Sequence, residues 1–122
     1  LFEISNHTYN LHSQKSGKMG VARLSGQNDE TYLSRISEDI IKMQDLLFEK
    51  TGIDSDIFVY PFGIAPEASR ELVKDLGFIC SFSCEEKKSV ISRDGDSLFD
   101  LGRYLRPSGI SSEEYFSKLG IQ

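Results

Sequence analysis

The stretch that decides the fold is Ile57-Phe58-Val59-Tyr60-Pro61-Phe62-Gly63, a short apolar run that is stopped by proline and glycine. Its β-branched and aromatic residues favour a strand over residues 57–60, and Pro61 and Gly63 predict a turn directly after it. The stretch lies between two segments with helical periodicity. Strands and helices that alternate through short connections indicate βαβ units and therefore a parallel sheet.

The segment before this strand predicts an amphipathic helix of about six turns. Its apolar residues recur at three- and four-residue steps: Leu33, Ile36, Ile40, Met43 and Leu47. Asn28 or Asp29 is suited to cap the start of this helix, and Gly52 is suited to follow its last turn. The helix would therefore cover one face of the predicted sheet.

The segment after the strand predicts a second helix, with Pro66 as its first residue and Gly77 as its stop. Its buried stripe would consist of Ala68, Leu72, Val73 and Leu76. Residues 78–82 predict the next strand. At the front of the chain, residues 1–5 predict another strand, buried on both faces.

The last third of the chain is less regular. Residues 89–92 and 98–101 flank Asp94-Gly95, which is a hairpin signal. Residues 103–107 predict a last strand. A capping box that begins at Ser111 predicts a final short helix.

Size and composition limit the class of protein. A chain of 122 residues predicts one domain, and a net charge of −5 with no basic stripe excludes a nucleic-acid partner. No apolar run approaches the roughly 18–20 residues of a membrane span. Cys80 and Cys84 on one strand would have Cα atoms about 13 Å apart, too far for a disulfide, so two buried free thiols are predicted.

Both histidines lie in a polar loop just behind the first predicted strand, Ser5-Asn6-His7-Thr8-Tyr9-Asn10-Leu11-His12. Neutral imidazoles are good ligands for zinc, and on a loop two of them can fold back on one ion. The alternative is two unrelated polar side chains, since a catalytic zinc usually has three protein ligands. The spacing does not identify a third ligand.

The two loops are predicted to meet. In parallel α/β folds the ligand site lies beyond the carboxyl ends of the strands. His7 and Phe62 each follow such an end, so both loops should point to one edge of the sheet. The turn at Pro61 can direct an exposed backbone N–H at a ligand. The alternative for residues 60–63 is an ordinary turn with an aromatic lid.

Residues 3–12 resemble the metal-binding histidine motif of the polysaccharide deacetylases (carbohydrate esterase family 4). Residues 58–63, with the helix through Leu72 and the following Leu76-Gly77-Phe78, resemble the next motif of that family in order and separation. The resemblance extends over essentially the whole chain and is weakest over residues 85–100. It implies an α/β fold, an irregular (β/α) barrel, of which residues 1–122 would be one incomplete domain without the N-terminal strands.

The resemblance also implies the chemistry. His7 and His12 would bind a divalent metal, usually zinc, and Thr8 would steady the histidine loop. The backbone N–H of Phe62 would help to hold the oxyanion.

The resemblance further implies which residues bind the sugar: Tyr60, Pro61, Phe62, Gly63 and Arg103. Tyr60 and Phe62 would form the walls of the sugar pocket. A structural ion pair is an equal alternative for Arg103.

The sequence also departs from the family pattern. An Asp-Asp pair that supplies the base and the third metal ligand would have to precede Leu1. The two histidines are separated by four residues rather than the commoner three, and Val59 stands where many members carry arginine. No further histidine is left to act as the acid, and tryptophan is absent. Residues 1–122 alone are therefore expected to be inactive or nearly so.

The resemblance thus implies a metal-dependent hydrolase of carbon–nitrogen bonds in linear amides. It would remove acetyl groups from a polysaccharide or oligosaccharide of a bacterial cell wall or envelope, outside the cell. One alternative is a non-catalytic carbohydrate-binding relative that keeps the cleft. Another is a plain α/β fragment whose histidines have no role. The oligomeric state is left open.

Overall fold

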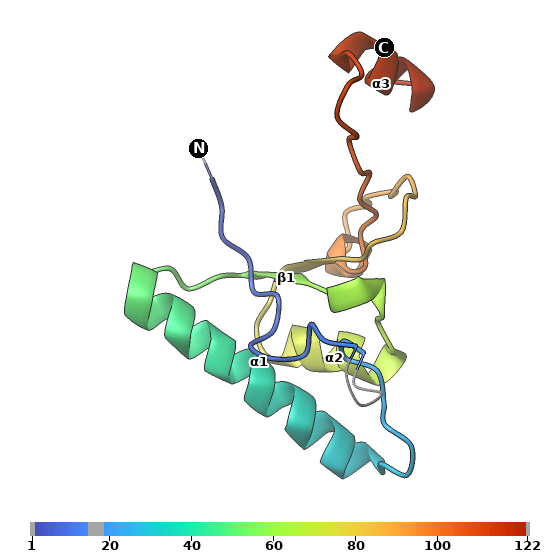
Figure 1. Cartoon of the computed structure of the whole chain (residues 1–122). Helices are drawn as coiled ribbons and strands as arrows, with labels where there is room; N and C mark the ends of the chain where they lie inside the picture. Colours follow the sequence, from blue (N-terminus) through green and yellow to red (C-terminus); the bar gives the residue numbers. More distant parts are fainter. Residues whose placement is uncertain (1, 15–18, 122) are drawn as a thin grey trace.

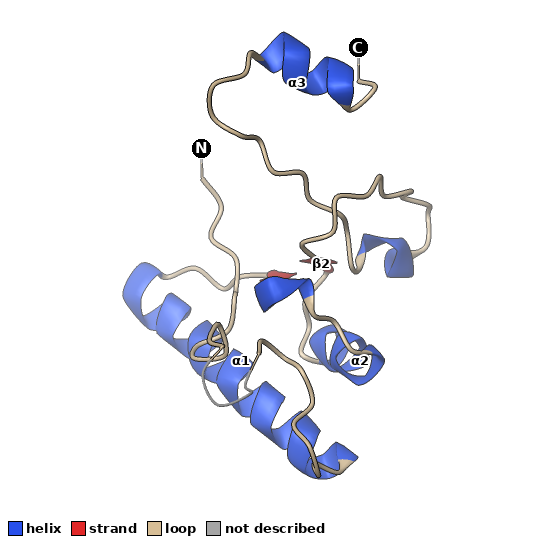
Figure 2. Cartoon of the chain, turned by 45° about the vertical axis from the view of Figure 1, so that its right-hand side comes forward, coloured by secondary structure: helices blue, strands red, loops and turns tan. Residues whose placement is uncertain are grey.

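The computed structural model describes residues 2–14 and 19–121 of the chain (Figure 1). Its elements are α1 (Asp29–Thr51), β1 (Ile57–Val59), the 3-10 helix η2 (Pro61–Gly63), α2 (Glu67–Asp75), β2 (Cys80–Phe82), the 3-10 helix η3 (Gly95–Leu98) and α3 (Ser112–Lys118). Helices α1 and α2 lie on the same side of the short sheet, and α3 lies beyond an extended segment, away from them (Figures 1 and 2).

The sheet is parallel, as the alternation of elements predicts. Strands β1 and β2 pair with Ile57 opposite Cys80. Isolated parallel bridges, between Asn6 and Phe58 and between Phe82 and Leu101, add one chain segment on each side. The order is therefore the Asn6 segment, β1, β2 and the Leu101 segment. Because all four run in one direction, the loops that follow them leave from the same edge.

Helix α1 confirms the prediction for this segment. Asn28 is its N-cap and accepts a hydrogen bond from the N–H of Thr31, and Gly52 follows its last turn in a left-handed conformation. Its buried residues are Tyr32, Ile36, Ile40 and Leu47. Met43 is only half-buried. Tyr32 extends the buried stripe because its hydroxyl donates to the carbonyl oxygen of Val21, which satisfies the polar end of a buried ring.

The core lies between the sheet and the two long helices. It consists of Leu11, Val21, Tyr32, Ile36, Ile40, Phe58, Tyr60, Val73 and Phe78. Pro66 is the N-cap of α2 rather than its first residue. Of the apolar residues predicted for this helix, Val73 belongs to the core, and Ala68, Leu72 and Leu76 pack against the core while partly exposed. Leu11 is a core residue although it lies in the histidine loop, so that loop is anchored in the interior.

Three predictions for the ends of the chain are wrong. Residues 2–4 are exposed and form no bridge with a described residue, because within the described chain this segment meets β1 only at Asn6; Leu1 itself is not described. The Asp94 side chain accepts from the N–H of Ser97 and caps η3, so Asp94-Gly95 forms no hairpin. Residues 103–107 form no strand.

Two other expectations concern the cysteines and membrane-spanning segments. Cys80 and Cys84 are free thiols as predicted, but Cys84 is exposed and Cys80 is only half-buried. Burial raises the pKa of the Cys80 thiol. Over the part of the chain that the structure describes, no helix is both long and apolar enough to cross a membrane.

Candidate functional site

The carboxyl edge of the sheet gathers the residues that the sequence singles out. The histidine loop follows Asn6, the Pro61 turn follows β1, Cys84 follows β2, and Arg103 follows the Leu101 segment. These connections leave one edge because the strands are parallel. The structure therefore brings the histidine loop and the Pro61 turn to the same edge.

The imidazoles of His7 and His12 lie close together. Their ring centroids are 5.0 Å apart and their planes are tilted by 46°. The Nδ1 atom of His7 is 2.7 Å from the carbonyl oxygen of Val59. Because a carbonyl oxygen only accepts, we assign the proton of the neutral ring to Nδ1, which leaves the lone pair on Nε2. An imidazole held in this way is prepared to bind a cation through Nε2.

The Pro61 turn packs on the second histidine. The ring of Phe62 stacks on His12 with a centroid distance of 4.4 Å and an angle of 27°. Phe62 and Gly63 both have left-handed backbone conformations, with φ of 58° and 68°. A Cβ atom on Gly63 would lie 2.8 Å from the backbone nitrogen of Cys84. Glycine is therefore required where the turn meets the segment after β2.

The N–H of Phe62 is an unpaired donor in this turn. The next two N–H groups, of Gly63 and Ile64, donate to the carbonyl oxygens of Tyr60 and Pro61. No residue of the described ranges accepts from the Phe62 N–H. A free backbone donor beside a candidate cation site can serve to stabilise a developing negative charge.

Asn6, which the sequence does not single out, fixes the start of the histidine loop. It is fully buried, and its Nδ2 donates to the carbonyl oxygen of Ile40 and to Oε1 of Gln44, both at 3.0 Å. Its Oδ1 accepts from the N–H of Thr8 at 3.0 Å. The side chain thus joins the loop to α1 directly beside His7.

Thr8 has a strained backbone conformation, and its buried hydroxyl lacks a hydrogen bond to a described residue. It has a φ of 70°, which is unfavourable for a β-branched residue, and it is buried. Its hydroxyl has no hydrogen-bond partner within the described part of the chain. Strained residues with unsatisfied groups concentrate at functional sites. The role predicted for Thr8, to steady the loop, stays a prediction.

Two residues predicted to bind the sugar do not reach the surface. Tyr60 is fully buried, with its hydroxyl 3.5 Å from the carbonyl oxygen of Ser69, and Pro61 is also buried. Burial raises the pKa of Tyr60 to about 12. The prediction that Tyr60 forms a wall of the pocket is therefore wrong, because its side chain points into the core. Phe62 and Gly63 are half-buried at the edge.

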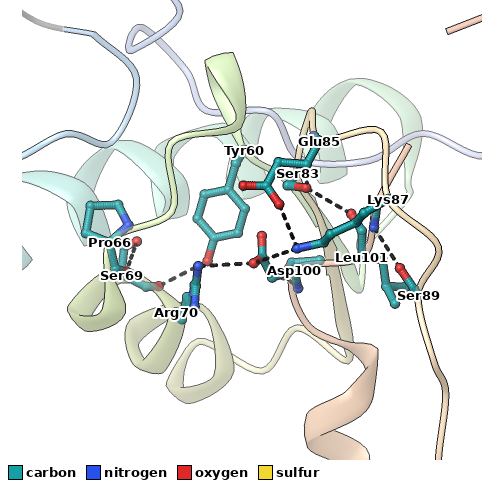
Figure 3. A network of polar contacts seen from close by, with 12 residues as sticks. Tyr60, Pro66, Ser69, Arg70, Ser83, Glu85, Lys87, Ser89, Asp100 and Leu101 are labelled. Atoms are coloured by element: carbon teal, nitrogen blue, oxygen red, sulfur yellow. Dashed lines mark hydrogen bonds and ion pairs between the residues drawn. The ribbon is translucent and has the colours of Figure 1, made fainter. Parts of the chain in front are cut away.

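Beside Tyr60 lies an ionic network that joins α2 to the Leu101 segment (Figure 3). The carboxylate of Asp100, whose side chain is 18% exposed, pairs with Arg70 at 3.0 Å and with Lys87 at 3.2 Å. Lys87 also pairs with Glu85 at 2.9 Å. Since its members neutralise one another, we interpret this network as structural.

Arg103 lies at the same edge as the histidines and binds a main-chain carbonyl oxygen and a thiol rather than an acid. Its Nε donates to the carbonyl oxygen of Ser83 at 2.5 Å and its Nη2 to Sγ of Cys84 at 2.7 Å. No carboxylate of the described chain pairs with it. Arg103 also lines a cavity of about 290 Å³ together with Cys84, Glu86, Tyr104 and Leu105. Its contact with substrate stays a prediction.

The donor set fits a zinc-type cation but is incomplete. Residues 2–14 and 19–121 contain no group of three or more histidine, cysteine or acidic side chains that could hold a metal ion. Two imidazoles, one with its tautomer fixed by a carbonyl oxygen, are the nitrogen ligands that zinc prefers. The arrangement can therefore supply two ligands of such a site.

Residues 2–80 match the family described as polysaccharide deacetylase. The chain belongs to the polysaccharide deacetylase family. No match to a curated protein was found.

Among solved structures, the chain is similar to the deacetylase domain of BpsB from Bordetella bronchiseptica, with 20% identity and a TM-score of 0.63 over 83% of this chain. It is similar to IcaB from Ammonifex degensii, with 27% identity and a TM-score of 0.62 over 93%. It is also similar to a de-N-acetylase from Aggregatibacter actinomycetemcomitans, with 22% identity and a TM-score of 0.66 over 93%.

The chain spans less than half the length of these structures, namely 42%, 44% and 47%. It therefore has the fold of part of a deacetylase domain, in agreement with the expected α/β fragment of a (β/α) barrel. The sequence resemblance to the family is confirmed by the match over residues 2–80.

Proposed function

We propose that the whole protein is a metal-dependent hydrolase that removes acetyl groups from N- or O-acetylated sugars of a cell-wall or envelope polysaccharide. Membership of the polysaccharide deacetylase family supports the reaction class. The observation that carries the proposal is the placement of His12, whose ring lies 5.0 Å from that of His7 and 4.4 Å from that of Phe62. Two imidazoles and a turn with a free N–H thus converge at the edge where α/β proteins bind ligands.

In this proposal His7 and His12 hold a divalent cation, of which zinc suits the imidazoles best. Such a cation, when bound, lowers the pKa of a water and polarises a carbonyl oxygen. The chain's own part is to orient its ligands. The carbonyl oxygen of Val59 keeps the proton of His7 on Nδ1, and the Phe62 ring limits the rotation of His12.

The Phe62 N–H is assigned to the oxyanion that forms when the acetyl carbonyl is attacked. The left-handed conformation of Phe62 and the tight contact of Gly63 with Cys84 fix the turn before substrate arrives. A donor fixed in advance stabilises the transition state without reorganisation. We assign no general base or acid to residues 1–122, which alone are expected to be inactive or nearly so.

Substrate would lie along the carboxyl edge, from Phe62 and Gly63 toward the cavity lined by Arg103. An acetylated polysaccharide or oligosaccharide is the partner in this proposal. The site of action would be outside the cytoplasm, at the envelope of a bacterium, because polysaccharide of this kind is found there.

The test is acetate release from N-acetylglucosamine oligomers by the complete protein, compared with a His7→Ala, His12→Ala double variant. The proposal expects release that the double variant loses. Oligomer binding without acetate release would instead support a non-catalytic carbohydrate-binding relative. Within residues 1–122 both histidines lie in the candidate metal motif, and we assign the acid to neither of them.

A further inference from the structure

The loop between the two histidines rests on the side of α1. Both carboxylate oxygens of Asp39 are used there: Oδ1 accepts from the N–H of Tyr9 at 2.7 Å, and Oδ2 accepts from the N–H of Asn10 at 3.0 Å. Hydrogen bonds to an ionised acceptor are shorter and stronger than neutral ones. One helical side chain therefore holds two consecutive peptide groups midway between His7 and His12.

Neighbouring contacts limit how this part of the loop can move. One turn further along α1, Nζ of Lys42 lies 3.9 Å from the centroid of the Tyr9 ring. Leu11 is buried in the core, only 6% exposed. Between these fixed points, Asp39 determines the course of the backbone that leads to His12.

His12 depends on that backbone more than His7 does. The ring of His7 is held by the carbonyl oxygen of Val59. For the ring of His12 the described chain provides stacking on Phe62 but no hydrogen bond. The position of the second imidazole relative to the first is therefore set mainly by the residues between them.

Asp39 is poorly suited to be a ligand itself. Both of its oxygens already accept backbone hydrogen bonds, and the described residues show no three-residue metal cluster that includes it. Asparagine at this position would accept only one of the two hydrogen bonds, because its amide nitrogen is a donor. The arrangement of two N–H groups specifically requires a carboxylate.

We propose that Asp39 is a positioning residue that sets the separation of the His7 and His12 imidazoles and thereby the affinity of the cation site. This inference rests on the proposed function, because it concerns the same site. It adds a residue on α1, distant in sequence, that touches neither the cation nor the substrate.

The experiment is a zinc titration of the complete protein and of its Asp39→Asn variant. Loss of a residue that supports metal ligands typically weakens metal binding by about ten-fold or more, and we expect a weakening of this size. The matched control is Asp45→Asn, which removes the same charge from α1. The side chain of Asp45 makes no hydrogen bond or ion pair to a described residue, so this variant should bind zinc as the unsubstituted protein does.

Amide hydrogen exchange in the metal-free protein gives a second readout, and its measurement on the unsubstituted protein requires no variant. The amides of Tyr9 and Asn10 should be protected in the unsubstituted protein and should exchange faster in a folded Asp39→Asn variant. Rapid exchange of both amides in the unsubstituted protein would overturn the inference. So would zinc affinity that Asp39→Asn leaves unchanged while the His7→Ala, His12→Ala double variant abolishes it. If the double variant also binds zinc normally, the proposed function fails instead.

Discussion

Replacing Asn6 by alanine should loosen the histidine loop from α1. The substitution removes three side-chain hydrogen bonds in a fully buried position, to Ile40, Gln44 and Thr8. At about 1 kcal/mol for each hydrogen bond, the free energy of unfolding should fall by about 3 kcal/mol. Much of this loss arises because the N–H of Thr8 would remain buried without an acceptor.

The assay is urea unfolding followed by circular dichroism, with the midpoint and the slope fitted separately. The midpoint should move to lower urea while the slope is unchanged, which identifies a loss of stability rather than a change in the unfolded chain. The matched control is Asn10→Ala in the same loop. The Asn10 side chain makes no hydrogen bond to a described residue, and its backbone N–H would still reach Asp39.

The reasoning also predicts a functional consequence. Because Asn6 precedes His7 directly, Asn6→Ala should weaken zinc binding in those molecules that remain folded. Equal stability of the Asn6→Ala and Asn10→Ala variants would refute the claim that Asn6 attaches the loop to α1. The refutation would hold whatever metal the protein binds.

Two further predictions concern the turn and the core. Gly63→Ala should destabilise the protein by about 2–4 kcal/mol, since it adds backbone strain and a Cβ 2.8 Å from the Cys84 nitrogen. Gly26→Ala, with a similar φ of +78° but open space around it, should cost clearly less in thermal unfolding. For Tyr60, the pKa is raised to about 12 in the folded state from an ordinary value of 10.0, so folding favours the neutral phenol. Its contribution, roughly 2–3 kcal/mol, is complete below pH 10 and is lost as the pH rises to 12. Tyr60→Phe should remove that alkaline loss from the stability profile, and an unchanged profile would contradict the assignment.

The sequence was sufficient for the parts of the fold that depend on local patterns. The apolar stripe and caps of α1 predict its bounds to within a residue, and the alternation of helices with short apolar runs predicts a parallel sheet. From a parallel sheet it follows that the loops after Asn6 and β1 share an edge. This topological rule predicts from local sequence patterns alone that the loops of His7 and Phe62 lie at the same edge.

The remainder depends on contacts that a sequence pattern does not contain. Asn6 and Asp39 form hydrogen bonds with residues that lie 34 and about 30 positions away in the sequence. No local periodicity therefore predicts these contacts. Strand β1 has three residues, too few for alternation to reveal that Tyr60, just beyond it, turns into the core. The strand predicted over residues 1–5 fails for a related reason: its apolar residues favour a strand, but in the described part of this segment only Asn6, just beyond it, pairs with β1.

The most direct test of the central claim is a zinc titration of the complete protein beside its His7→Ala, His12→Ala double variant. If the two imidazoles at the carboxyl edge bind one cation, the unsubstituted protein should bind one zinc ion. The double variant should lose this zinc ion while it remains folded. Equal zinc binding by the two proteins, or none by the unsubstituted one, would contradict the account.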